Sequence, residues 1–168
     1  VPLNAMLEAG KHYLRKQNRS TGIADEEIIK IAVKSMGLDD LYPFDPKEKI
    51  IEYKMEAVRP GKKYLRDLSL SGFMNETASE SPAPGGGSVS AYIGSLGAAL
   101  GTMVANLSSH KRGWDERWEE FSNLAEEGKK IQEELLALTD KDTQAFDAII
   151  EAFRIKAKTS EEKKNKEK

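Results

Sequence analysis

A stretch without charge, residues 81–109, constrains the fold of this chain more than any other feature. It contains no Asp, Glu, Lys or Arg, although 32% of the 168 residues are charged. Within it, the segment PAPGGGS precedes a run of Gly, Ala, Ser and aliphatic residues. This run predicts a helix from about Ser88 to Leu107 that is apolar on every side, and such helices lie in interiors or interfaces. The fold must therefore cover this helix.

Three environments suit such a helix. A membrane span fits its length and its Gly97-to-Gly101 spacing. We favour a buried helix of a soluble bundle and expect no membrane span, because Gly, Ala and Ser gain little in lipid and the usual flanks are missing. Small side chains also let a second backbone approach, which suits a subunit interface and predicts a homo-oligomer. The small residues are Gly94, Gly97, Ala98, Gly101 and Ala105.

Composition excludes several classes of function. The charges, 26 Lys and Arg against 28 Asp and Glu, give a net charge of −2, which provides no basic field for nucleic acid. Absence of Cys excludes disulfides, thiolate metal sites and Cys nucleophiles. The two histidines, His12 and His110, form no spaced ligand set, so we expect no metal and take His12 as structural. No leader sequence opens the chain, and we expect a cytoplasmic protein.

The first piece of the chain, residues 1–58, predicts a small incomplete α/β unit. Apolar spacing predicts helices over residues 2–17 and 25–36. Lys49 to Met55 is short, β-branched and aromatic, which predicts a strand. Because one strand cannot make a sheet, the other strands of this unit are expected to lie elsewhere.

The second piece, residues 59–168, predicts a helical bundle and makes the whole chain mainly α. Pro60-Gly61 breaks regular structure and marks a linker between the pieces. Beyond it the apolar spacing is helical, with a short helix near Leu65 to Phe73 and a long pattern from Trp114 to Phe153. Trp114 and Trp118 are interpreted as packing residues.

The loop before the apolar helix is a candidate anion site. Gly85, Gly86 and Gly87 allow backbone N–H groups to approach a ligand at the positive end of a helix dipole, and Ser88 can cap the helix. A flexible turn is the alternative interpretation. At the other end of the helix, Lys111 either stabilises the C-terminus or receives an anionic group.

A carboxylate interrupts the apolar face of the long helical pattern. Counting from Leu135 and Leu138, the next inward position is Asp142. A buried carboxylate there is suited to proton transfer as a general acid or base. The alternative is that the helix breaks at Thr139-Asp140 and Asp142 caps a new helix, and Asp140 is then the alternative carboxylate.

These motifs resemble the cyclodeaminase family, the formimidoyltetrahydrofolate-processing half of formiminotransferase–cyclodeaminase. The similarity rests on PAPGGGS, the small-residue helix, Lys111 and a D-x-x-A-F run at Asp142, Ala145 and Phe146. Residues 1–58, particularly KSMGLDDLYPFDPKEKIIEY, resemble the last part of the formiminotransferase half. The resemblance covers nearly the whole chain, with the junction near 59–63.

The resemblance implies a folate-dependent enzyme of histidine degradation. The transferase half moves a formimino group from formiminoglutamate to tetrahydrofolate, the one-carbon carrier. The cyclodeaminase half closes 5-formiminotetrahydrofolate to 5,10-methenyltetrahydrofolate and releases ammonia, with no metal. Asp142 would be the acid/base group, Gly85, Gly86, Gly87 and Ser88 would hold the folate, and Lys111 would bind its anionic, including polyglutamylated, part.

The resemblance also implies an all-helical fold that forms a dimer or a ring of dimers. Against the family pattern, we expect further helices of the cyclodeaminase and the catalytic region of the transferase to lie outside these 168 residues. The alternative is a non-catalytic helical module that dimerises through residues 94–105.

Overall fold

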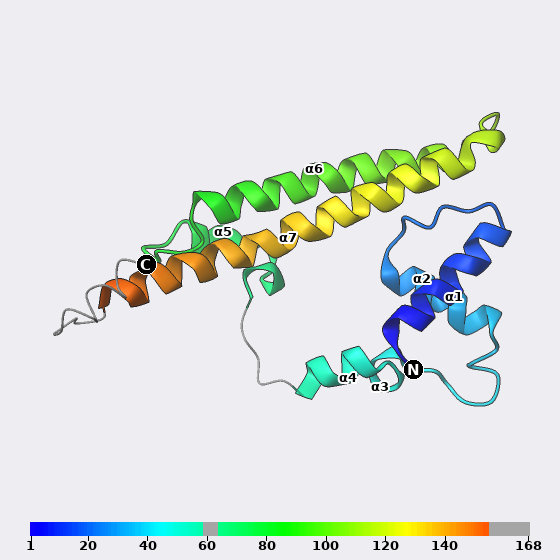
Figure 1. Ribbon diagram of the computed structural model, residues 1–168, viewed down its shortest axis with the longest axis horizontal. Coiled ribbons are helices and arrows are strands. Elements are labelled where there is room, and N and C mark those ends of the chain that lie inside the picture. The colour runs from blue at the N-terminus through cyan, green and yellow to red at the C-terminus, as the bar shows by residue number, and fades with distance from the viewer. Residues whose placement is uncertain (59–63, 155–168) are drawn as a thin grey trace, which may run out of the picture. The chain divides into compact units, whose positions relative to one another are not determined.

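The computed structural model describes residues 1–58 and 64–154, and the regular structure of these residues is helical throughout (Figure 1). This confirms the mainly α prediction. The helices are α1 (Leu3–Lys16), α2 (Asp25–Ser35), α3 (Pro46–Lys49), α4 (Ile51–Val58), the 3₁₀ turn η1 (Leu65–Asp67), α5 (Leu70–Thr77), α6 (Gly86–Ser109), the 3₁₀ turn η2 (Asp115–Arg117) and α7 (Trp118–Arg154).

The chain forms two compact units. Unit 1 consists of residues 1–62 and 96–132, and unit 2 of residues 63–95 and 133–168. The helices α6 and α7 therefore each contribute one part to each unit. The domain boundary predicted between 58 and 59 adjoins residues 59–63, which lie outside the described residues, and it stays a prediction.

A small apolar core in unit 1 joins α1, α2 and Ile50, the residue between α3 and α4. Its buried members are Met6, Ile29, Ala32, Val33 and Ile50. The buried residues of α1 are Met6, Gly10 and Leu14, four residues apart, and those of α2 follow the three- and four-residue spacing that the sequence predicts. This confirms both of those helices.

The strand predicted from Lys49 to Met55 is wrong, because this segment is helical. Asp45 caps α3 by accepting a hydrogen bond from the Lys47 N–H at 2.9 Å, and Pro46 occupies the first helical turn. Ile50 is extended and buried, and α4 follows at once. A β-branched run needs a neighbouring strand to pair with, and the described residues offer none. The expected incomplete α/β piece is therefore helical where it is described.

Small and hydroxyl side chains let α6 and α7 pair closely. In unit 1, a Cβ added to Gly128 would lie 2.5 Å from the Thr102 hydroxyl oxygen. In unit 2, Ser88 lies beside Thr139, whereas Gly94, later in α6, packs against Leu135, earlier in α7. The two helices therefore run antiparallel. Gly97, in contrast, faces open space, so only part of the small-residue face predicted on α6 is used by this pair.

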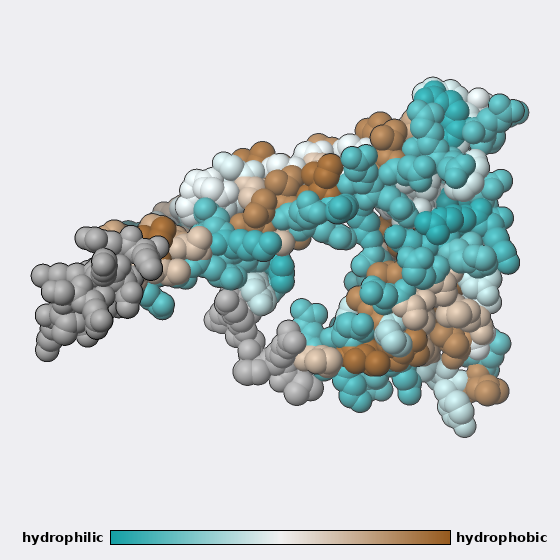
Figure 2. Space-filling view, viewed as in Figure 1, coloured by the Kyte–Doolittle hydropathy of each residue, from teal (hydrophilic) through white to brown (hydrophobic). Residues whose placement is uncertain are grey.

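The apolar surface of α6 is largely exposed. Within its most apolar 18 residues only 22% are buried, and by length and composition α6 is the one described helix that could cross a membrane. The prediction of a fully buried helix is therefore wrong for the single chain. Figure 2 shows apolar patches along the α6 and α7 pair. The exposed side chains, at 49–67% of their maximum, are Ile93, Leu96, Leu100, Met103, Val104 and Leu107.

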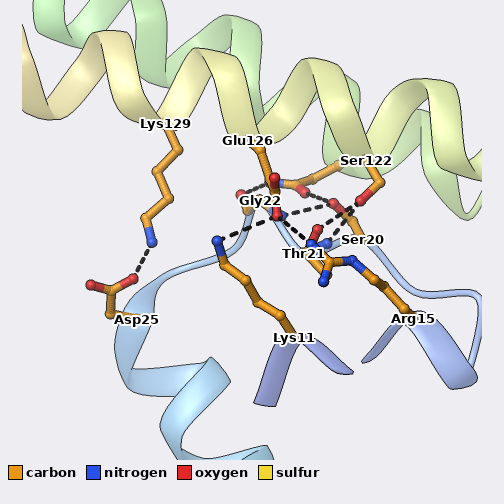
Figure 3. Close-up of polar contacts among 10 residues, drawn as sticks. Lys11, Arg15, Ser20, Thr21, Gly22, Asp25, Ser122, Glu126 and Lys129 are labelled. Carbon is orange, nitrogen blue, oxygen red and sulfur yellow. Dashed lines mark hydrogen bonds and ion pairs between the residues drawn. The ribbon is translucent and has the colours of Figure 1, made fainter. Parts of the chain in front are cut away.

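A buried polar contact joins the α1–α2 loop to α6 and α7 within unit 1 (Figure 3). The Ser20 hydroxyl donates to the Asn106 side-chain oxygen at 2.6 Å, and the Asn106 amide donates to the Gly22 carbonyl at 2.8 Å. The Thr21 N–H donates to the Ser122 hydroxyl at 3.0 Å. Because Ser20, Thr21 and Ser122 are buried, these bonds replace those that water would make.

Ion pairs surround this polar contact. Glu126 of α7 lies 3.4 Å from the Lys11 ammonium and 3.5 Å from the Arg15 guanidinium of α1. Lys129 pairs with Asp25 at the start of α2. Burial raises the pKa of Glu126, but hydrogen bonding from Thr21 and the charges of Lys11 and Arg15 outweigh burial and hold that pKa below its ordinary value.

The lowered pKa of Glu126 predicts a pH dependence of stability. Its carboxylate stabilises unit 1 fully above the unfolded pKa of 4.5, and this contribution is lost as the pH falls through the lower folded pKa. Urea unfolding of Glu126→Gln should therefore show reduced stability at neutral pH and a smaller loss of stability below pH 4.5 than the wild type. Glu127→Gln, an exposed neighbour, is the control and should behave as the wild type does. If Glu126→Gln and the wild type lose equal stability below pH 4.5, the stabilising role of the Glu126 carboxylate is contradicted.

Candidate functional site

The glycine loop and the first turn of α6 form the floor of the candidate site in unit 2. Gly85 is exposed, and α6 begins at Gly86, so Gly87 and Ser88 lie in its first turn. The first N–H groups of a helix have no partner within it, and in a long helix they carry the positive end of the dipole. This end of α6 therefore favours a negative group.

The Asp142 carboxylate of α7 provides that negative group. Its Oδ2 accepts hydrogen bonds from the Ser88 N–H at 2.8 Å and from the Ser88 hydroxyl at 2.9 Å. Ser88 and Asp142 are 54 residues apart in the sequence, so tertiary structure supplies this cap. The interaction is charge-assisted, which makes it stronger than a neutral hydrogen bond.

Gly87 is required for the close approach of Asp142. A Cβ added at Gly87 would collide with the Asp142 carboxyl group, while a Cβ at Gly85 or Gly86 would meet nothing within 4 Å. Of the three glycines, only Gly87 is thus fixed by packing, and the other two face open space. Asp142 is exposed, so a ligand can reach it.

The prediction that Asp142 faces the core is wrong, and so is its alternative of a new helix. Helix α7 runs without a break from Trp118 to Arg154. Leu138 is 45% exposed, whereas Thr139 is fully buried and Asp140 is 5% exposed. The side of α7 that faces α6 contains Leu135 and, four residues later, Thr139. Asp142 lies at the edge of this side and is exposed.

Asp140, the alternative carboxylate, is the buried one and has a structural role. Its Oδ1 accepts a hydrogen bond from the Leu65 N–H at 2.7 Å, and Oδ2 lies 3.5 Å from the Arg66 guanidinium. Arg66 also stacks on the Tyr64 ring, 4.5 Å from its centroid. Asp140 thus anchors η1 to α7 within unit 2.

Ser88 holds the carboxylate rather than facing a ligand. It is fully buried, and its hydroxyl lies 2.9 Å from both the Thr139 carbonyl oxygen and Asp142 Oδ2. With one hydrogen, the hydroxyl donates to one of them at a time. Thr143, whose hydroxyl lies 3.2 Å from that of Ser88, was not predicted as a neighbour of Ser88, and Thr139 was predicted only as part of a helix break. Thr139 and Thr143 follow Leu135 at steps of four residues, and this helical spacing could have placed them on the same face of α7 as Leu135.

Lys111 belongs to unit 1, whereas the other predicted site residues belong to unit 2. It follows the C-terminal end of α6 and is exposed, with its ammonium 4.3 Å from the centroid of the Trp114 ring. Trp114 stacks on Phe121, which supports its interpretation as a packing residue. The structure therefore brings Gly87, Ser88 and Asp142 together in unit 2 and places Lys111 outside that cluster.

A pocket of about 670 Å³ lies elsewhere, in unit 1. Its apolar floor includes Ile29, Pro46 and Tyr53. Burial, and then the negative charges of Asp25 and Glu26, raise the pKa of Tyr53. None of the predicted site residues lines this pocket.

Two family models match the chain. The model described as formiminotransferase-cyclodeaminase matches residues 69–168, and the model described as formiminotransferase domain matches residues 1–56. The loop, Ser88 and Asp142 all lie within the first match, and the α1–α2 loop lies within the second.

Curated relatives agree with these models. The formimidoyltransferase-cyclodeaminases of Mus musculus and Gallus gallus are 39% and 38% identical to 97% and 99% of this chain. The chain spans 30% of the length of each. A methenyltetrahydrofolate cyclohydrolase of Methylorubrum extorquens is 35% identical over 54% of the chain and 44% of its own length.

The buried position of Asp140 predicts a larger effect on stability than on any ligand. Asp140→Ala should lower the free energy of unfolding by about 2 kcal/mol, because it leaves the Leu65 N–H without its acceptor and Arg66 without its partner. Chemical denaturation measures this. Asp147→Ala, an exposed Asp of the same helix, is the matched control and should change stability by less than about 0.5 kcal/mol. Equal effects of the two substitutions would refute the structural role of Asp140.

Proposed function

The chain belongs to the formiminotransferase-cyclodeaminase family, as its motifs predicted, and we propose that it carries part of a folate cyclodeaminase site. In this proposal 5-formiminotetrahydrofolate is converted to 5,10-methenyltetrahydrofolate with release of ammonia. Tetrahydrofolate is the one-carbon carrier and thus part of the substrate. The activity is joined to a glutamate formiminotransferase, whose catalytic region is not assigned to any residue here.

The single observation that carries the proposal is the Asp142 carboxylate held beside a glycine-lined helix start. The Ser88 N–H donates to one carboxylate oxygen, the Ser88 hydroxyl lies 2.9 Å from the same oxygen, and Gly87 leaves space for the other. A carboxylate oriented in this way, yet open to solvent, has the geometry of an acid/base group. The cyclodeaminase and cyclohydrolase names of the relatives support the same class of reaction.

The proposed chemistry needs one proton to move between two nitrogens of the substrate. The terminal nitrogen of the formimino group is protonated, N10 of the folate attacks the formimino carbon, and a new C–N10 bond forms. The proton on N10 passes to the departing nitrogen, the bond from carbon to that nitrogen breaks, and ammonia leaves. The carbon then bridges N5 and N10. Asp142 can accept the proton from N10 and return it to the leaving group, while the loop holds both nitrogens in line.

The loop and Lys111 have different roles in this proposal. Gly85 and Gly86 face open space and would hold the folate, and Ser88 would act through Asp142. Lys111 remains a proposal for the anionic, including polyglutamylated, part of a folate, and its place outside the cluster gives it no direct support.

A homo-oligomer is also proposed. The exposed apolar side chains of α6, among them Leu96, Leu100 and Leu107, would be covered by a second copy rather than by lipid. The resemblance implies a dimer or a ring of dimers. Sedimentation of the purified chain as a single 18.7 kDa species would contradict this proposal.

A second candidate reaction is hydrolysis of methenyltetrahydrofolate, which the 35% identity to the Methylorubrum extorquens cyclohydrolase favours. Water would then attack the methenyl carbon, one of the two bonds from this carbon to N5 and N10 would break, and a formyl-tetrahydrofolate would form without release of ammonia. A third hypothesis is a helical module without catalytic activity, for which neither reaction is expected. Mixing the purified chain with 5-formiminotetrahydrofolate, and separately with methenyltetrahydrofolate, distinguishes the three by methenyl absorbance and ammonia release. The proposal expects absorbance to rise together with ammonia, and folate binding without either change would refute it.

The role of Asp142 predicts a loss of turnover with binding preserved. Asp142→Asn keeps the size and one acceptor of the side chain but removes its ability to carry a proton, so kcat should fall by about 100-fold or more. The KM for the folate should stay within about threefold of the wild type. Asp147→Asn is the control, and its kcat should match the wild type. An unchanged kcat in Asp142→Asn would end the role proposed for Asp142.

A further inference from the structure

Unit 1 combines segments that two different family models match. Residues 1–56 match the formiminotransferase domain, whereas residues 96–132 lie within the cyclodeaminase match. The boundary between the two units therefore does not coincide with the boundary between the two family matches. The surface between these two segments of unit 1 contains none of the groups used in the proposed reaction.

Gly22 lies at the centre of this surface. It is buried, and a Cβ added to it would collide with the backbone of Ala125 on α7. Ala125 is itself fully buried. Two backbones thus touch where neither residue has a side chain larger than a methyl group, and any larger residue at either position would separate the two surfaces.

Hydrogen bonds surround the Gly22–Ala125 contact, and both the loop and the helices supply donors and acceptors. The Asn106 side chain accepts from the Ser20 hydroxyl and donates to the Gly22 carbonyl, so both ends of its amide are used. The Ser122 hydroxyl accepts from the Thr21 N–H and lies 3.0 Å from the Thr21 hydroxyl. The loop and the helices therefore satisfy each other's buried polar groups.

Charges outside the hydrogen bonds are complementary. Lys11 and Arg15 of α1 face Glu126, and Asp25 of α2 faces Lys129 (Figure 3). Both signs thus occur on each side, and they alternate so that a displaced loop would bring like charges together. Such patterns fix the register of a specific interface.

We propose that residues 11–25 dock into a preformed receptor on α6 and α7, made by Asn106, Ser122, Ala125, Glu126 and Lys129, and that this contact holds the transferase-family segment onto the cyclodeaminase-family segment of the same chain. The close packing, the paired hydrogen bonds and the alternating charges form an interface that does not need the covalent linker. The proposal is independent of the reaction proposed above, because Ser88 and Asp142 belong to unit 2.

The proposal is tested by cleaving the chain between the transferase-family and cyclodeaminase-family segments and measuring whether the two pieces remain associated. A protease recognition site is inserted between Pro60 and Gly61 of the full chain, the folded protein is cleaved, and the pieces are diluted to low micromolar concentration. Gel filtration with mass spectrometry then follows them, and far-UV circular dichroism confirms that helices persist. We expect both pieces to elute as one complex. Separate elution with helices retained would overturn the proposal.

Matched variants locate the interface within that complex. Gly22→Ala should abolish co-elution, because the added methyl group collides with Ala125. Ser122→Ala, a milder change, should reduce the co-eluting fraction, whereas Asn123→Ala, its exposed neighbour, should leave that fraction unchanged. Co-elution that resists both Gly22→Ala and Ser122→Ala would show that another surface holds the pieces and would overturn the proposal.

Amide exchange in the uncut chain gives a readout that does not depend on cleavage. The Thr21 N–H should exchange slowly in the wild type and in Asn123→Ala, and at least about tenfold faster in Ser122→Ala, which lacks its acceptor. Equal exchange rates in these three proteins would overturn the assigned contact.

Discussion

Close approach of α7 to α6 is the constraint on which both units depend. Where the two helices meet, the side chains are small or carry a hydroxyl group: Thr102 against Gly128 in unit 1, and Ser88 beside Thr139 in unit 2. Such residues bring backbones close enough for side chains of one helix to reach main-chain groups of the other. A larger residue at Gly128 would push Thr102 away. On the side of α6 that meets α7, a charged side chain has no room, and the absence of charge on that side follows from this.

The same close approach has a different consequence in each unit. In unit 2 it lets a carboxylate of α7 cap the N-terminus of α6, which places Asp142 beside Gly87. In unit 1 it places Ser122 and Asn106 where both can bond to the Ser20–Gly22 loop. One helix pair thus supplies a candidate reaction site with one part of its length and a docking surface with another.

Periodicity and glycine placement predicted α1, α2 and α6 from the sequence, because each has an apolar face and a clear end. The strand at Lys49–Met55 was wrong because Asp45 and Pro46 start a helix just before it, and local β propensity has no partner strand to act on. The predicted placement of Asp142 in the core was wrong, because Asp142 is exposed. Continuing the spacing from Leu138 placed it in the core, whereas the buried face runs through Thr139, a polar residue that hydrophobic periodicity overlooks. The roles of Gly22 and Asn106 depend on residues about 80–100 positions away, so no local pattern could reveal them.

We propose that the glycine loop holds the folate beside Asp142, and nuclear magnetic resonance measures this binding directly. The ¹⁵N-labelled chain is titrated with 5-formiminotetrahydrofolate, and backbone amide resonances are followed. We expect shifts at Gly85, Gly86, Ser88 and Asp142, with Thr21 unchanged. Shifts confined to residues of unit 1, or folate binding that leaves the loop resonances in place, would contradict this proposal.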